Sequence, residues 1–130
     1  MKFSLAILLC LFAAGCATST IESRRKERLA SYNALPPDQK QLVDQGQIKV
    51  GMSTDAVYIA WGKPGEVLKG ASESGETITW AYFDTYLQEI HYWGWRRVRT
   101  DFYPVHYVRA KVVFVNGVVK EWQTYPGPGY

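Results

Sequence analysis

The stretch "IKVGMSTDAVYIAWGKPGE", residues 48–66, carries the strongest local structural signals of the chain. Ser53 is a good N-cap, because its side-chain oxygen can accept a hydrogen bond from a backbone amide of the first helical turn. Gly62 favours the left-handed conformation that ends many helices, and Pro64 prevents continuation beyond it. The stretch therefore predicts a short helix that begins after Ser53 and ends at Gly62.

The flanking segments predict one more helix and a sheet. "PPDQKQLVDQG", residues 36–46, has proline at the start and glycine at the end, as expected of a short helix. "EVLKG", residues 66–70, reads as a short strand, and "ASESGE" as a turn. "TITWAYFDTYL", residues 77–87, alternates as a strand does. One face of that strand would carry Ile78, Trp80 and Tyr82.

A hairpin is predicted near the C-terminus. Asn116 and Gly117 separate two β-branched runs, and both residues of a type I′ turn need positive φ. This turn opposes Val115 to Val118, Phe114 to Val119 and Val113 to Lys120. The expected core face carries Val108, Ala110, Val112, Phe114 and Val119. The opposite, mixed face would carry Arg109, Lys111, Val113, Val115, Val118, Lys120 and Trp122.

These elements predict an α+β domain with two layers. Two short N-terminal helices would pack on a sheet of three to four antiparallel strands, in the order ααβββ. The domain is expected to span residues 35–125, and residues 126–130 form a Pro/Gly tail that cannot pair further.

The first residues have the features of an export signal. Lys2 precedes the apolar run "FSLAILLCLF", and small residues follow it. The run is shorter than the ~20 apolar residues that span a bilayer. The junction "AAGC" resembles the lipobox of bacterial lipoproteins, which implies removal of residues 1–15 and a diacylglycerol on Cys16; an ordinary secretory cleavage is the alternative. By resemblance to lipoprotein sorting, Ala17 implies the outer membrane, with the domain lipid-anchored at its periplasmic face.

Residues 16–34 are expected to form a flexible or partly helical tether. The segment "IESRRKER" has an excess of basic residues, whereas the remainder of the chain is balanced. Two readings stay open for this cluster. A basic segment beside a lipid anchor attracts anionic head groups, and a solvated linker or a frayed helix would have the same composition.

Little in the sequence indicates catalysis, a metal or a cofactor. The chain has 130 residues, 47% of them hydrophobic, enough for one domain with a compact core. Cys10 lies in the signal and Cys16 would be acylated, so no thiol is left for chemistry. The two histidines, His91 and His106, lack the spacing of metal ligands. No spacing pairs the carboxylates of Asp84, Glu89 and Asp101. We expect a protein that is not an enzyme.

Residues 86–107 are unusually rich in aromatic side chains and arginine. This combination is typical of protein interfaces, membrane head-group belts and single-stranded nucleic-acid sites, of which an exported protein rarely meets the last. Stacking on cell-wall glycans is another reading, and a hairpin extension whose rings pack on the sheet is the purely structural one. The residues expected to bind a protein partner or head groups are Trp93, Trp95, Arg96, Arg97 and Arg99.

Three segments together resemble the BamE/SmpA/OmlA lipoprotein domain: the stretch at 48–66, "TITWAYF", and "AKVVFVNGVVKEWQ". The resemblance implies a fold like that of β-lactamase-inhibitor proteins and a non-catalytic role in assembling outer-membrane β-barrel proteins. It assigns structural positions to Gly51, Met52, Ser53, Val57, Gly62, Pro64, Trp80 and Tyr82.

Three functions are consistent with these features. The leading one is a scaffold or adaptor lipoprotein that binds an envelope protein, in β-barrel assembly or envelope integrity. The second is a lipoprotein that binds peptidoglycan or another glycan. The third, which rests on fold analogy, is an inhibitor of an envelope enzyme.

Overall fold

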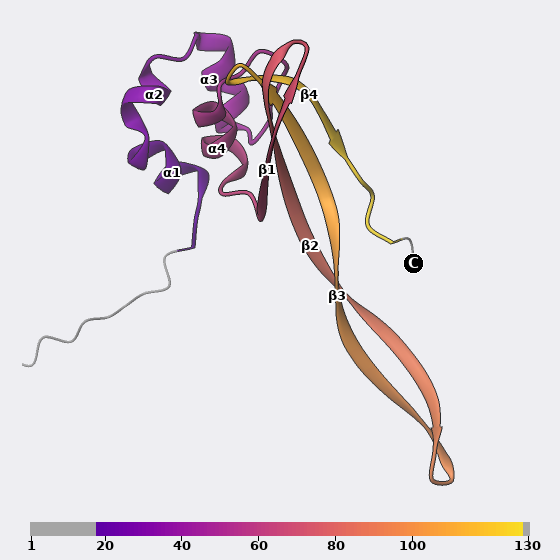
Figure 1. The fold of residues 1–130 in the computed structure, drawn as a ribbon. Coiled ribbons are helices and arrows are strands. Elements are labelled where there is room, and N and C mark those ends of the chain that lie inside the picture. Colours follow the sequence, from indigo (N-terminus) through magenta and orange to yellow (C-terminus); the bar gives the residue numbers. More distant parts are fainter. Residues whose placement is uncertain (1–17, 129–130) are drawn as a thin grey trace, which may run out of the picture.

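The computed structural model describes residues 18–128 and shows an α+β fold. Helices come first along the chain and strands follow (Figure 1). The helices are α1 (Ile21–Glu27), α2 (Leu29–Asn33), α3 (Pro37–Asp44) and α4 (Thr54–Trp61). The strands are β1 (Glu66–Ser72), β2 (Gly75–Gly94), β3 (Arg97–Val115) and β4 (Val118–Thr124). The two predicted helices are confirmed as α3 and α4.

Helix α4 has the predicted ends. The Ser53 side chain accepts a hydrogen bond from the Ala56 amide at 3.2 Å, and Gly62 adopts φ 87° at the C-cap. The Gly62 amide donates to the Tyr58 carbonyl at 2.7 Å, which closes the last turn. Ala56, Val57, Ile59 and Ala60 are buried, so this helix is the centre of the helical layer.

The strands form one antiparallel sheet in the order β1-β2-β3-β4. The predicted C-terminal turn is confirmed: Asn116 and Gly117 have φ of 51° and 81°, and Val115 pairs with Val118. The strand predicted at 77–87 lies within β2, which is much longer. In Figure 1 the helices gather beside one end of the sheet, and β2 and β3 continue far beyond them as a twisted pair.

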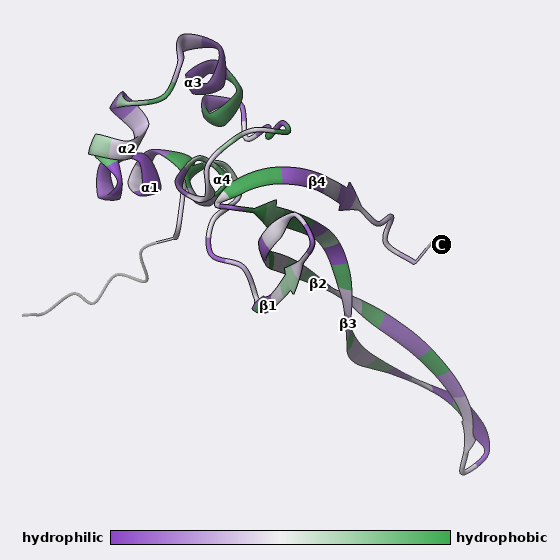
Figure 2. Ribbon diagram, turned by 45° about the horizontal axis from the view of Figure 1, so that its top comes forward, coloured by the Kyte–Doolittle hydropathy of each residue, from purple (hydrophilic) through white to green (hydrophobic). Residues whose placement is uncertain are grey.

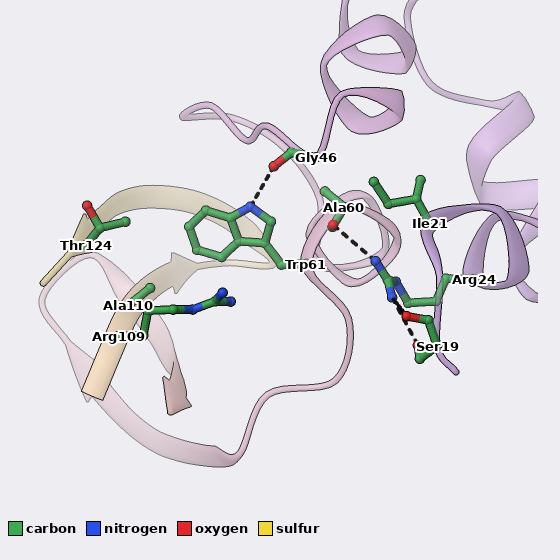
Figure 3. A pocket seen from close by; sticks show the side chains of 9 residues that line it. All are labelled: Ser19, Ile21, Arg24, Gly46, Ala60, Trp61, Arg109, Ala110 and Thr124. Atoms are coloured by element: carbon green, nitrogen blue, oxygen red, sulfur yellow. Dashed lines mark hydrogen bonds between the residues drawn. The ribbon is translucent and has the colours of Figure 1, made fainter. Parts of the chain in front are cut away.

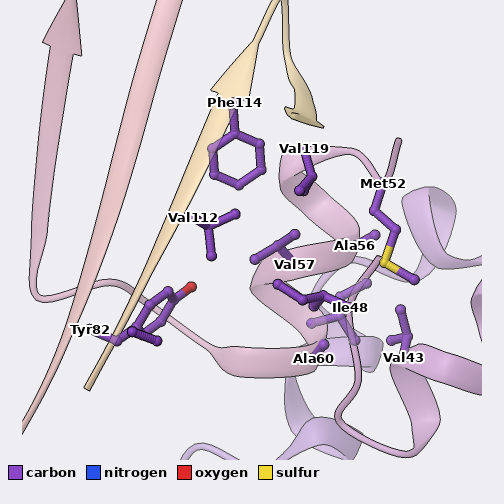
Figure 4. Close-up of a cluster of buried hydrophobic side chains, with 12 residues drawn as sticks. Val43, Ile48, Met52, Ala56, Val57, Ala60, Tyr82, Val112, Phe114 and Val119 are labelled. Carbon is purple, nitrogen blue, oxygen red and sulfur yellow. The ribbon is translucent and has the colours of Figure 1, made fainter. Parts of the chain in front are cut away.

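The core lies between α4 and the helix-facing side of the sheet (Figure 4). Its largest side chains with under 2% exposure are Phe114, Met52, Ile59, Val43, Val57, Val112 and Val119. Ile78 and Trp80 pack against this cluster from β2, as the alternation predicted. Tyr82 is 4% exposed and donates a hydrogen bond to the Gly62 carbonyl at 3.0 Å.

Two bulges overturn part of the predicted register. Val113 pairs with Glu121, not Lys120, because the β3–β4 ladder shifts between Val113 and Phe114. Trp122 consequently pairs with Val112 on the core face, and its ring lies 5.9 Å from that of Trp61. The prediction that placed Trp122 on the mixed face is wrong.

The second bulge lies at Arg109, where Tyr82 pairs with Ala110 but Phe83 pairs with Val108. A bulge adds one residue to one strand, so every residue beyond it changes face. Val108 therefore leaves the core face on which it was predicted, whereas Ala110 is 2% exposed and stays in the core.

The predicted tether is largely folded, and the expected domain start at residue 35 is too late. Helices α1 and α2 occupy the segment and both contact α4. Arg24 holds this segment against α4: its side chain is only 7% exposed, and its Nε donates to the Ile59 carbonyl at 2.9 Å. Ile21 and Tyr32 also pack against the core cluster.

The basic cluster of this segment is engaged within the domain. Arg25 forms an ion pair with Asp44 at 3.2 Å, and Lys26 one with Glu22 at 3.0 Å. Arg28 pairs with Asp55 and lies over the Tyr58 ring. The two helices agree with the partly helical form of the predicted tether, and these contacts contradict its reading as a freely solvated linker.

Candidate functional site

The outer halves of β2 and β3 form a two-stranded arm, defined here as residues 83–108. Strand β1 ends its pairing with β2 at Ala81, and β4 ends its pairing with β3 at Ala110. The Tyr125 amide still donates to the Arg109 carbonyl at 2.7 Å, and beyond this bond the two long strands pair, among the described residues, only with each other. No helix of the described chain covers them in Figure 1. The arm is thus the one large part of this fold that the core does not require.

The tip of the arm is a two-residue loop. Trp95 and Arg96 connect the last pair, Gly94 and Arg97. Arg96 adopts φ 61°, a left-handed conformation that non-glycine residues rarely take. At Gly94 a side chain would come within 3.1 Å of the Arg99 side chain, so glycine permits the close approach there. The loop is tight and presents its side chains outward.

The arm has two faces, because directly paired residues of antiparallel strands share a face. The odd-numbered residues of β2 form one face with their β3 partners, which include the pairs Phe83–Val108, Leu87–Pro104 and Trp93–Val98. The even-numbered residues form the other face, with Tyr86–Val105 and Ile90–Asp101 among its pairs. Both faces mix apolar and polar side chains, since each set of pairs contains both kinds. Figure 2 shows hydrophobic and hydrophilic residues interspersed along the arm.

The arm concentrates exposed apolar surface. Nine of the fifteen large hydrophobic side chains that are exposed among the described residues belong to it. They are Phe83, Leu87, Ile90, Tyr92, Trp93, Trp95, Val98, Phe102 and Tyr103. Exposed contiguous apolar surface on a small protein commonly marks an interaction site.

The predicted binding residues meet at the tip. Trp93 is 77% exposed and Trp95 87% exposed. Arg96 and Arg97 belong to the same turn, and Arg99 pairs with Tyr92 on the opposite face from Trp93. Within residues 18–128 no carboxylate forms an ion pair with these three arginines, so the tip is basic as well as aromatic. The purely structural alternative, in which the aromatic rings pack on the sheet, is therefore wrong for Trp93 and Trp95.

Side-chain hydrogen bonds between β2 and β3 stabilise the arm. Thr85 Oγ1 lies 2.7 Å from His106 Nδ1, and Thr100 Oγ1 lies 2.9 Å from His91 Nδ1. The Tyr92 hydroxyl donates to Asp101 at 2.7 Å, which raises the pKa of that tyrosine. Each histidine is therefore an exposed surface residue hydrogen-bonded to threonine.

The three carboxylates considered from the sequence are not brought together. Asp84 and Asp101 lie on the even face, far apart along the arm, and Glu89 lies on the odd face. In the described part of the chain no group of three or more His, Cys, Asp and Glu side chains could hold a metal ion. The arrangement of the arm fits binding by surface contact.

Sequence reasoning missed the contribution of Leu87 and Ile90 to the exposed surface of the arm. Leu87 is 59% exposed and Ile90 41% exposed. The signal that could have found them is compositional: residues 83–93 contain six aromatic or aliphatic side chains and neither glycine nor proline, so the strand need not end at residue 87. Apolar residues at both odd and even positions place apolar side chains on both faces of a long hairpin, and a single layer of helices can cover only one face.

A hollow of about 610 Å³ lies at the junction of the helices and the sheet (Figure 3). Its lining residues are Ser19, Ile21, Arg24, Gly46, Ala60, Trp61, Arg109, Ala110 and Thr124. Trp61 Nε1 donates to the Gly46 carbonyl at 2.9 Å, which fixes the indole at its wall. None of these lining residues is an acid, a histidine or a cysteine, so the hollow offers no general base or thiol.

The two arginines of the hollow differ. Arg24 donates to the carbonyls of Ser19, Ile59 and Ala60, so carbonyl groups surround its guanidinium. Arg109 is the exposed residue at the bulge of β3. Burial raises the pKa of the nearby Tyr82 hydroxyl, an effect that Arg24 and Arg109 partly offset. Arg24 therefore has a structural role at the C-terminus of α4.

Comparison with known proteins does not assign the chain to a group. No family model, curated protein or solved structure matches it. Among residues 18–128, no helix is both long enough and apolar enough to cross a bilayer.

Proposed function

We propose that this chain is a non-catalytic adaptor lipoprotein of the bacterial envelope that binds a partner protein through its arm. The observation that carries the proposal is the arm itself, a projecting hairpin whose tip has exposed tryptophans and arginines that form no ion pair among residues 18–128. Aromatic side chains and arginine dominate the binding energy of protein interfaces. A domain that needed the hairpin only for folding would cover these side chains.

The described residues outside the arm, 18–82 and 109–128, form what we call the base of the molecule, and the base is suited to holding the arm in position. The core cluster draws on α3, α4 and the inner ends of β2, β3 and β4, and it uses none of residues 83–108. Edge-to-face contacts stabilise this base, since the Trp61 ring packs against the rings of both Tyr82 and Trp122. A rigid base positions the arm, and changes at the arm tip should leave the base folded.

We further propose that the base is a BamE/SmpA/OmlA-type domain of two helices and a sheet. The support is the sequence motif at 48–66, together with the order of α3, α4 and the strands. Helices α1 and α2 and the arm would then be additions to that domain. A lipid on Cys16, which lies outside the described residues, would hold the protein at the periplasmic face of the outer membrane.

The test is photo-crosslinking in cells, with a photoreactive amino acid in place of Trp95. We expect crosslinks to outer-membrane β-barrel proteins or to the machinery that assembles them. A probe in place of Lys69, an exposed residue of β1 at the base, is the matched control and should give none.

A double variant extends the test. Trp95→Ala with Arg97→Ala should abolish the adaptor's crosslinks, because interface anchors commonly cost 2 kcal/mol or more on truncation. Stability should change by no more than about 0.5 kcal/mol, since both side chains lie outside the core. The control pair is Val67→Ala with Lys69→Ala, an exposed apolar and a basic residue on β1. Retention on purified cell wall without any protein crosslink would instead favour glycan binding.

A further inference from the structure

The outer edge of β2 is uncovered along the arm. Pairing with β1 stops at Ala81, so within the described chain nothing pairs with this edge over residues 82–94. Edge strands of natural proteins are commonly protected by lysine, proline or a bulge. The segment "FDTYLQEIHYW", residues 83–93, contains neither lysine nor proline, and the bulge at its start places the extra residue on β3.

Two hydrogen bonds fix which residues of β2 point outward. The Ala81 carbonyl accepts from the Gly65 amide, on the β1 side of β2. The Glu76 carbonyl accepts from the Asn116 amide, on the β3 side. Backbone groups of successive residues point to opposite edges of a strand. The odd-numbered residues from 83 to 93 therefore direct their amide and carbonyl groups to the open edge.

The edge of β3 is different. Pro104 pairs with Leu87, so its backbone nitrogen also faces outward, where it has no hydrogen to donate. This interrupts the β3 edge near its middle. The two edges of the arm are thus unequal, and only that of β2 offers an unbroken row of donors and acceptors.

We propose that the β2 edge pairs with the β2 edge of a second copy of this chain, antiparallel about a two-fold axis at Ile90. In that register Ile90 faces Ile90 of the second copy. Glu89 faces His91 of the second copy, and Leu87 faces Trp93. About eight backbone hydrogen bonds would form across the edge.

Electrostatic complementarity supports this occupant, because Glu89 supplies carboxylate oxygens that accept hydrogen bonds and His91 supplies an imidazole N–H that donates one. Glu89 and His91 share the odd face, with His91 Nε2 already 3.5 Å from Glu89 Oε1 within one chain. Pairing places each imidazole between two carboxylates and each carboxylate between two imidazoles. The turn at the tip of each arm, with Arg96 and Arg97, would also come near Asp84 of the second copy, and none of these three side chains forms an ion pair among the described residues.

Other registers also let the outward backbone groups of the odd-numbered residues bond to the second copy, but they pair the side chains less well. A centre at Gln88 would put Trp95 of the second copy opposite Ala81, a place that Glu66 of β1 already fills. A centre at Glu89 would oppose two glutamates. With a centre at His91, the two imidazoles would meet, and Glu89 would face Trp93. Among these registers, only the one at Ile90 pairs Glu89 with His91 and leaves β1 in place.

The self-pairing goes beyond the adaptor function and does not depend on it. The test uses the full chain in cells, with Ile90→Cys. Ile90 and its symmetry mate would form a non-hydrogen-bonded pair with Cα atoms about 4.5 Å apart, within the range that a disulfide bridges. We expect a disulfide-linked dimer on non-reducing gels that reducing agent removes.

Gln88→Cys is the matched control, on the same face and strand. Gln88 would lie about 13 Å from its symmetry mate, too far for a disulfide, so its dimer should be at least about tenfold weaker. The parent chain, which retains Cys10 and Cys16, gives the background. Adding Leu87→Pro to Ile90→Cys should abolish the dimer, because proline there removes an outward amide while the β2–β3 ladder keeps its bonds.

The outcomes separate the two proposals. Absence of the Ile90→Cys dimer, or an equal dimer from Gln88→Cys, would overturn the self-pairing whatever the Trp95 probe shows. A specific Ile90→Cys dimer in cells where the Trp95 probe captures no envelope protein would support self-pairing and overturn the adaptor function.

Discussion

Replacing Arg24 with alanine tests whether the segment before residue 35 belongs to the folded domain. The Arg24 side chain is 7% exposed and reaches the end of α4, where Nε donates to the Ile59 carbonyl and Nη2 to the Ala60 carbonyl at 2.9 and 3.2 Å. These carbonyls belong to the last turn of the helix, which has no intrahelical donors for them. A cation there also interacts favourably with the helix dipole.

The magnitude follows from the two buried hydrogen bonds. Each bond from a charged donor contributes about 1.5–3 kcal/mol, so their loss would cost about 3–6 kcal/mol if nothing replaced them. The neighbouring hollow lets water reach the carbonyls after truncation, which favours the lower end. We expect Arg24→Ala to lower the free energy of unfolding by about 3 kcal/mol. Arg24→Lys should restore part of the lost stability, because lysine supplies the positive charge but lacks the several N–H donors of the guanidinium group.

Urea unfolding of residues 18–130, followed by tryptophan fluorescence, would measure the change. Arg25→Ala is the control: Arg25 lies next in sequence, but its ion pair with Asp44 is partly exposed, with side-chain exposures of 36% and 39%. Ion pairs at the protein surface contribute little to stability, because solvent screens them. If Arg24→Ala cost no more than Arg25→Ala, the segment would be a tether after all and the burial argument would be refuted.

Two further predictions concern the helix cap and the anchor. Ser53→Ala should cost about 1 kcal/mol of stability through the lost cap, and Gly62→Val should cost more, because valine is strained at φ 87° and its side chain would press on Arg24; a loss of function in Ser53→Ala at unchanged stability would point to a reactive serine instead. Cys16→Ser should release the protein from membranes and abolish fatty-acid labelling, and a variant that still sediments with membranes, with no label on the parent chain, would contradict lipidation.

The sequence predicted the elements whose signals are local. Helix α4 begins at its serine cap and ends at its glycine, and the turn at Asn116 and Gly117 sets the first pairs of the last hairpin. Caps and tight turns depend on the φ preferences and side-chain hydrogen bonds of a few neighbouring residues. The sequence also singled out the aromatic and arginine residues that the structure places at the tip of the arm, because tryptophan and arginine crowded in one segment are a compositional signal. They meet at one tip because that segment turns once.

The tertiary structure alone decided the features that depend on distant partners. The bulges at Arg109 and at the β3–β4 ladder moved Val108 off the core face and Trp122 onto it, because a bulge has no short-range signature and one extra residue reverses every later side chain. Arg24 looked like part of a solvated basic run, yet the end of α4, 35 residues away, offers carbonyls that bury it. The same holds for the arm: alternation indicates a strand, but only the extent of the neighbouring strands and helices determines which part of that strand remains uncovered.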